Sequence, residues 1–166
     1  MEAIFKLKTI LNEKKDHAGH GKNVLQFTFD EKEYSWTKQY ISGSEIRKLC
    51  NVPQGFDILL AIKRPWEDEE IRDDTKVNLA RPEIEHFFSK KKGGHHLVTI
   101  HINDIPRKIS RGKHTVTEIK KIGEVPASHE LEELIEGKLT PLDDNATVLI
   151  KGCEQFFSHV RDGSSS

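Results

Sequence analysis

Apolar and polar residues alternate in two short stretches of the chain. Residues 25–29 read Leu-Gln-Phe-Thr-Phe, and residues 98–102, 73 positions later, read Val-Thr-Ile-His-Ile. Strict alternation predicts strands with one buried face. Each stretch is followed by a polar pair, at residues 30–31 or 103–104, and then by a second strand pattern, at residues 34–36 or 107–109. The pattern therefore predicts two β-hairpins, although neither turn carries the stronger Asn-Gly or Asp-Gly signal.

A short helix is predicted after each hairpin. Residues 42–53 and 115–126 both open with Ser or Thr and have Glu three positions later, which is the capping box of a helix start. A Pro ends each stretch and cannot continue the helix. The apolar positions that we expect to be buried on these helices are Ile46, Leu49, Ile119 and Ile122. Recurrence at a constant spacing identifies an internal repeat.

Each half closes in the same order. After the helix come a strand pattern, a polar stretch with an Asp-Asp pair and an aromatic strand ending in Phe-Phe-Ser. The closing strands lie 69 rather than 73 residues apart, so the first half has extra residues, which we place in a loop at residues 66–69. The order hairpin, helix, strand, loop, strand packs one sheet face against a single helix. Predicted strands lie at residues 57–62, 84–89, 129–135 and 153–158.

The repeat sets the domain organisation. We expect an N-terminal extension (1–21), a first domain (22–92), a linker (93–96), a second domain (97–160) and a C-terminal tail (161–166). In the extension, Ile4, Leu7 and Leu11 fit one helical face, while Phe5, Leu7, Thr9 and Leu11 fit a strand. Docking on its own first domain, docking on a neighbouring copy and a disordered tail all stay open.

Composition excludes several classes of function. Apolar residues make up 35% of the chain and charged residues 32%, as in soluble globular proteins. The chain has no apolar run near the roughly 18 residues of a spanning helix and no secretory signal pattern, so a cytoplasmic location is expected. Lys and Arg (26) nearly balance Asp and Glu (27), which disfavours nucleic acid and membrane as partners and favours protein.

Residues that could carry chemistry are few. Cys50 and Cys153 form no C-x-x-C pair, so we expect both to be small core residues rather than disulfide or zinc ligands. Histidines cluster at residues 17–20 and 95–96 without acidic or thiol partners at ligand spacing, which disfavours a metal. The chain also lacks nucleophile-triad and phosphate-loop motifs. The interpretation is a non-enzyme without a cofactor.

The motif order resembles that of bacterial multiubiquitin-type proteins, the two-domain modifiers of bacterial ubiquitin-like conjugation operons that act against phages. The resemblance covers residues 22–163. It is densest at residues 98–160, where the motifs at 117–119, 125–126, 134–138 and 143–144 follow in the family's order. Both halves also end like ubiquitin, at residues 90–94 and 161–163. The predicted fold class is α+β, with two tandem ubiquitin-like β-grasp domains, an N-terminal extension and a flexible C-terminal tail.

The resemblance implies a covalent protein modifier. Its Gly163 carboxylate would be activated with ATP by an activating enzyme, passed to a conjugating enzyme as a thioester and joined to a target amine. Glycine suits this role because it has no Cβ beside the reacting carboxylate. The terminal pair is Asp162-Gly163 rather than Gly-Gly, and residues 164–166 would first be removed by a deubiquitinase-like metallopeptidase. Arg161, Asp162, Gly163 and Ser164 are therefore the expected recognition residues, and phage structural proteins are one class of target.

The expected surfaces leave alternatives open. Residues 134–138 resemble the ubiquitin strand that carries its partner-binding isoleucine, which makes Ile135 the candidate patch residue. Because strand neighbours point to opposite faces, the reverse arrangement, with Leu134 outside, also fits. We expect residues 160–166 to leave the domain as an extended tail, while a frayed Ser-rich end is the alternative. A tandem binding module that is not conjugated, or a sulfur carrier, are the competing functions.

Overall fold

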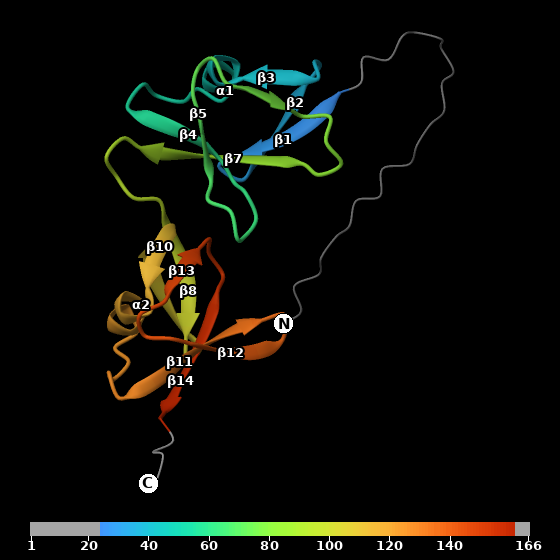
Figure 1. Cartoon of the computed structure of the whole chain (residues 1–166). Coiled ribbons are helices and arrows are strands. Elements are labelled where there is room, and N and C mark those ends of the chain that lie inside the picture. Colours follow the sequence, from blue (N-terminus) through green and yellow to red (C-terminus); the bar gives the residue numbers. More distant parts are fainter. Residues whose placement is uncertain (1–23, 162–166) are drawn as a thin grey trace, which may run out of the picture.

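The computed structural model describes residues 24–161 and contains two sheet-dominated units with one helix each (Figure 1). The predicted N-terminal extension and residues 162–166 lie outside the described residues. The first unit consists of β1 (Leu25–Phe29), β2 (Lys32–Trp36), β3 (Tyr40–Ser42), α1 (Gly43–Leu49), β4 (Phe56–Leu60), β5 (Glu69–Ile71), β6 (Lys76–Asn78) and β7 (Glu85–Lys91). The second consists of β8 (Leu97–Ile102), β9 (Ile105–Ser110), β10 (Gly112–Thr115), α2 (Val116–Ile122), β11 (His129–Ile135), β12 (Lys138–Leu142), β13 (Thr147–Ile150) and β14 (Gln155–Val160).

The two units share one topology. The five-stranded sheets run β2-β1-β7-β4-β5 and β9-β8-β14-β11-β12, and two-stranded sheets pair β3 with β6 and β10 with β13. In each large sheet the closing strand lies parallel to the first strand, while the hairpin is antiparallel. This mixed arrangement, with one helix over one sheet face, is compatible with two β-grasp-like domains. Over residues 24–161, neither helix has the length and apolar character needed to cross a bilayer.

Both predicted hairpins are confirmed, and their turns explain the repeated Ser of the closing strands. All four turn residues, at positions 30, 31, 103 and 104, have φ between 46° and 66°, the values of a tight two-residue hairpin turn. These values are unfavourable for residues other than Gly. The side chain of the first turn residue compensates by bonding to the Ser. Asp30 accepts hydrogen bonds from the N–H and the hydroxyl of Ser89 (both 2.8 Å). Asn103 accepts from the N–H of Ser158 and donates to its hydroxyl (both 2.8 Å). Each turn is thereby fixed to the closing strand.

The helix starts are confirmed, but one of the predicted buried positions is wrong. Ser42 and Thr115 are the N-caps, and the capping box with Glu45 or Glu118 is complete in both helices. Ile46 and Ile119 are fully buried, and Ile122 is partly buried against the second core. Leu49, in contrast, is 37% exposed. Leu49 is the last residue of α1, where the helix ends at the surface of the first unit.

Two other expectations, on the burial of Cys153 and on the start of the C-terminal tail, are corrected. Cys153 is exposed, with φ of 68°, because it lies in the bend before β14 rather than in the core; Cys50 is partly buried. Burial raises the pKa of the Cys50 thiol to about 11. Val160 does not begin the tail, since it is the last residue of β14 and pairs with His129 of β11.

The helix packing gives a stability prediction. Replacing Ile119 with Ala should lower the free energy of unfolding by about 2 to 5 kcal/mol, because the cavity lies in a fully buried core. Leu49→Ala serves as the control and should cost about 1 kcal/mol, since Leu49 is partly exposed. Urea denaturation followed by circular dichroism measures both. Equal losses for the two variants would contradict this placement of the helix faces.

Candidate functional site

The extra residues of the first half form a loop that contacts the second unit. The connection between β4 and β5 covers residues 61–68, whereas the equivalent β11–β12 connection is a two-residue turn. The loop thus begins earlier than predicted, and Glu69 already belongs to β5. In Figure 1 it reaches from the first unit toward the second. Charged side chains of this loop form ion pairs with the second unit.

Asp68 is the centre of these contacts. Its carboxylate accepts hydrogen bonds from Arg111 Nε (2.5 Å) and Nη2 (3.0 Å), from Lys151 Nζ (2.7 Å) and from the backbone N–H of Ile62 (3.0 Å). The Asp68 side chain is only 10% exposed, and both cations are similarly buried. Burial alone would raise the pKa of Asp68, but the hydrogen bonds from Arg111, Lys151 and Ile62 outweigh it and hold this pKa below its ordinary value. The carboxylate is therefore charged and fully coordinated.

A second ion pair, in which only the carboxylate is buried, and a ring contact extend the same interface. Arg64 donates to Glu133 through Nη1 (2.5 Å) and Nη2 (3.2 Å), and the hydrogen bond raises the pKa of Arg64. The Arg111 guanidinium lies 5.0 Å from the centre of the Phe88 ring, a cation–π distance. Phe88 in turn contacts His96 of the linker, with ring centres 4.6 Å apart. We call this set the seam: Arg64, Asp68, Phe88, His96, Arg111, Glu133 and Lys151.

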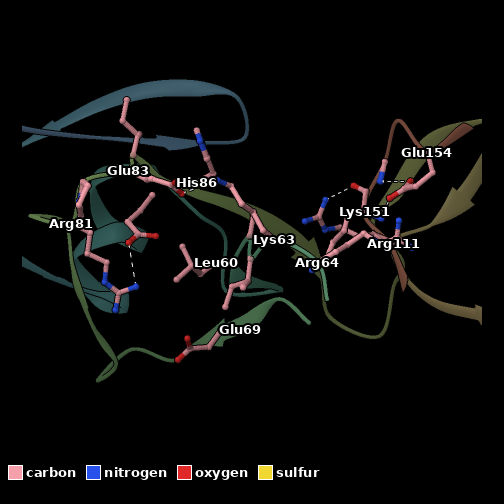
Figure 2. Close-up of a pocket in the computed structure, with 16 residues that line it drawn as sticks. Leu60, Lys63, Arg64, Glu69, Arg81, Glu83, His86, Arg111, Lys151 and Glu154 are labelled. Carbon is pink, nitrogen blue, oxygen red and sulfur yellow. Dashed lines mark hydrogen bonds and ion pairs between the residues drawn. The ribbon is translucent and has the colours of Figure 1, made fainter. Parts of the chain in front are cut away.

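A groove lies beside the seam and is lined by both units. Its volume is about 910 Å³, and Figure 2 shows first-unit residues such as Leu60 and Arg81 separated from Arg111, Lys151 and Glu154 of the second unit. We call it the interdomain groove. Its lining residues are Leu60, Ala61, Ile62, Lys63, Arg64, Glu69, Arg81, Pro82, Glu83, Ile84, Glu85, His86, Arg111, Lys151, Gly152 and Glu154.

Ile135, the predicted patch residue, is 42% exposed at the end of β11. By strand alternation it shares a face with buried Leu131, while Leu134 points to the opposite face and pairs with Leu139, which is 43% exposed. Ile135 is exposed because it lies at the strand end, past the core. The β11–β12 hairpin therefore presents apolar groups on both faces, and the role of Ile135 as a docking residue stays a prediction.

Of the predicted tail residues, the structure describes Arg161, whereas Asp162, Gly163 and Ser164 lie outside the described residues. Arg161 donates to Asp144, and the buried Lys120 donates to the same carboxylate and to the carbonyl of His129 (2.7 Å). The bond from Lys120, together with that from Arg161, holds the pKa of Asp144 below its ordinary value. The sequence showed Asp144 only as half of a repeated Asp-Asp pair. Its bridge to the tail was missed.

Residues 25–92 match the model of the Multiubiquitin family, which supports a ubiquitin-like module in the first unit. That family is not a known family of enzymes. The match covers the first half of the chain, whereas the motifs that suggested the resemblance are densest in the second half. No curated protein matches the chain. Among residues 24–161 there is also no group of three or more His, Cys, Asp or Glu side chains placed to hold a metal ion.

The seam gives a second prediction. Asp68→Ala leaves Arg111 and Lys151 without their carboxylate in a buried environment, which is costly, so the two units should separate and reorient. NMR relaxation should then give different correlation times for the two units, in place of one shared value. Glu67→Ala is the matched control on the same loop: its pair with Lys113 is more than half exposed on both sides and should contribute little.

The same contact should depend on pH with a defined sign. Because the pKa of folded Asp68 is lowered, its stabilising contribution is complete above the ordinary Asp value of 3.8 and is lost as the pH falls through the lower, folded value. The correlation times of the two units, measured from pH 6 downward, should stay equal until the pH falls below 3.8 and diverge only at lower pH. An Asp68→Asn variant should lack this transition, and an unchanged transition in that variant would show that another group controls the seam.

Proposed function

We propose that the chain is a ubiquitin-like protein modifier that is processed after Gly163 and conjugated to targets through the Gly163 carboxylate. An activating enzyme, a conjugating enzyme and a deubiquitinase-like metallopeptidase of a bacterial operon carry out the chemistry, in defence against phages. The match of residues 25–92 to the Multiubiquitin family supports the module class. The observation that carries the proposal is the position from which the carboxyl end leaves the second unit.

The last strand carries the chain away from the first unit. Residues 152 and 154, just before β14, line the interdomain groove, and the six residues of β14 then advance the chain by about 20 Å. Figure 1 shows β14 ending at the end of the second unit that points away from the first. An enzyme cleft can therefore approach the segment after Arg161 without meeting the first unit. This is the access that activation and processing both require.

The ion pairs of Asp144 with Lys120 and Arg161 fix the point from which the C-terminal tail leaves the second unit. The carboxylate is held by Lys120, which is buried, and Arg161 is attached to that fixed carboxylate. Arg161 is two residues before Gly163, so an enzyme that binds its guanidinium also positions the reactive carboxylate. Binding of this kind would replace the Asp144 partner with an acidic group of the enzyme.

The chemistry uses only the terminus of the modifier. Hydrolysis of the bond between Gly163 and Ser164 frees the Gly163 carboxylate. That carboxylate attacks the α-phosphate of ATP and releases pyrophosphate, after which a cysteine thiolate displaces AMP and forms a thioester. A target amine then attacks the thioester carbonyl and releases the thiol. No side chain of the two units takes part in these steps.

The internal Gly-Gly pair does not offer a second terminus. Gly93 has φ of 69° in a turn, the N–H of Gly94 donates to the carbonyl of Lys91 (2.8 Å), and the N–H of Lys92 donates to Gly55 (2.8 Å). A peptidase that reads an extended segment would have to open this turn and the adjacent packing of His96. The two units are therefore conjugated together as one modifier.

A binding module that is never conjugated is the second candidate. It is favoured by the exposed Ile135 and Leu139 on one hairpin, since apolar side chains at the surface are typical anchors of protein partners. In that case the carboxyl end is inert and the surfaces of the units carry the function. The two candidates differ in whether a covalent adduct forms.

The tail substitution decides between the candidates. Gly163→Val places a branched side chain beside the reacting carboxylate and should abolish adduct formation, because the cleft that accepts glycine excludes it. Intact mass and gel shifts after incubation with the enzymes of the neighbouring operon measure the adducts. The control is Ser165→Val, which lies beyond the cut and should conjugate normally. A chain ending at Gly163 should need no peptidase but still need activation. Adducts formed by Gly163→Val would refute the modifier proposal.

The apolar hairpin gives a separate prediction. Ile135→Asp should weaken binding to the partner enzymes by roughly 30-fold or more, the effect of losing one apolar anchor. Ile105→Asp is the matched control, because Ile105 is also about half exposed but lies at the opposite edge of the same sheet. Affinities follow from titration calorimetry, with thermal unfolding to show that both variants fold. If the two variants bind equally well, Ile135 is not part of a docking surface.

A further inference from the structure

The interdomain groove has an apolar floor and a rim of charges that are already paired. Leu60, Ile62, Pro82 and Ile84 provide the floor, and the Ile84 side chain is 52% exposed. Most of the charged residues of the rim have a partner: Lys63 pairs with Glu83 (2.9 Å), Arg81 with Glu85 (3.4 Å), and the seam residues pair with one another. A groove of this kind favours an apolar segment with modest charge over a strongly acidic or basic partner.

The groove lies at the end of the sheet where the described chain begins. β1 and β7 are parallel, with Phe27 beside Glu85. Continued by one residue, the same register brings Gln26 beside Ile84. The N–H of Ala61 also donates to His86, so the end of β4 lies at this sheet end too. The chain therefore enters the first unit at the same end of the sheet as Ile84, and Val24 lies two residues before the position opposite Ile84.

The segment that joins there is apolar. Residues 4–11 read Ile-Phe-Lys-Leu-Lys-Thr-Ile-Leu, so five of the eight are apolar and two are lysines. Leu11 precedes Val24 by 13 residues, which can span up to about 45 Å when extended and about 20 Å as a helix. Either conformation is long enough to return along the sheet end to the groove.

We propose that residues 4–11 pack into the interdomain groove of their own chain. They would cover Ile84 on the first unit and the residues next to Gly152 on the second, and so strap the two units together beside the seam. The choice of this occupant rests on three observations: the chain enters at the sheet end that carries Ile84, the groove floor is apolar, and the charges of the rim are paired. The inference does not depend on conjugation, since it concerns the opposite end of the chain from Gly163.

NMR spectra of the full chain and of a chain lacking residues 1–22 test the proposal. The described sheets begin at Leu25, so the deletion removes no strand. Amide shifts should change at Ala61 and Ile84 in the first unit and at Gly152 in the second. Changes confined to residues 24–27, beside the cut, would overturn the proposal.

Two further variants keep the test independent of the deletion. Leu7→Asp with Leu11→Asp in the full chain should reproduce the shifts of the deletion, while Thr9→Asp with Asn12→Asp adds the same charges at polar positions and should not. Wild-type shifts in the first variant, or equal shifts in both, would refute packing through the apolar positions.

Limited proteolysis tests the contact between residues 4–11 and the groove through a substitution in the groove. Ile84→Asp leaves residues 4–11 unchanged but puts a charge on the floor, so trypsin cleavage after Lys6 and Lys8 should become at least tenfold faster. Ile105→Asp, in the second unit, should leave the rate unchanged. Sedimentation of the full chain over a hundredfold concentration range shows whether the segment in the groove comes from the same chain or from a second copy. A monomer supports packing within one chain. A dimer that dissociates on deletion of residues 1–22 assigns the groove to a second copy and overturns the proposal.

Discussion

The arrangement of the two units depends on the Asp68 carboxylate. It is almost buried, and it accepts hydrogen bonds from Arg111, Lys151 and the backbone of its own loop. A duplicated fold provides two equivalent units but nothing that joins them, because each core is complete in itself. The ion pairs that join them come from residues 61–68, the connection that is long in the first unit and a tight turn in the second. The departure from the repeat, rather than the repeat, therefore creates the interface.

Buried ion pairs of this kind fix a geometry without necessarily being more stable than an apolar contact. Removing Asp68, Arg111 and Lys151 from water costs energy that their mutual contacts only offset, so an apolar interface could hold the units at least as tightly. An ion network is satisfied in one geometry, however, whereas apolar surfaces tolerate sliding. Arg64 and Glu133 add a second fixed point. With both points engaged, the walls of the interdomain groove keep one spacing and the carboxyl end leaves in one direction.

The sequence predicted what local patterns determine and missed what tertiary contacts determine. Hairpins and capping boxes are decided within a few residues, and both were predicted correctly. Leu49 was assigned to the core because a three-residue spacing fits a helix face. The same spacing places Ile122 against the second core but leaves Leu49 exposed at the end of α1. Cys153 was assigned to the core by residue type, but it lies in a bend. The seam could not be predicted, because Asp68 on a polar loop looks the same whether it faces water or a buried Arg111.

The glycines that end the two halves show how context decides the meaning of a motif. Both pairs, Gly93-Gly94 and Asp162-Gly163, follow a closing strand and resemble the end of ubiquitin. The first continues into the linker, where backbone hydrogen bonds and the contact between Phe88 and His96 hold it in place. The second follows Arg161, which a single carboxylate at the far end of the second unit holds. A cleft that needs an extended, unpaired glycine can use only a segment that the fold has not already engaged. The internal pair is held by its own turn, and the conjugation proposed above therefore assigns the reactive role to Gly163.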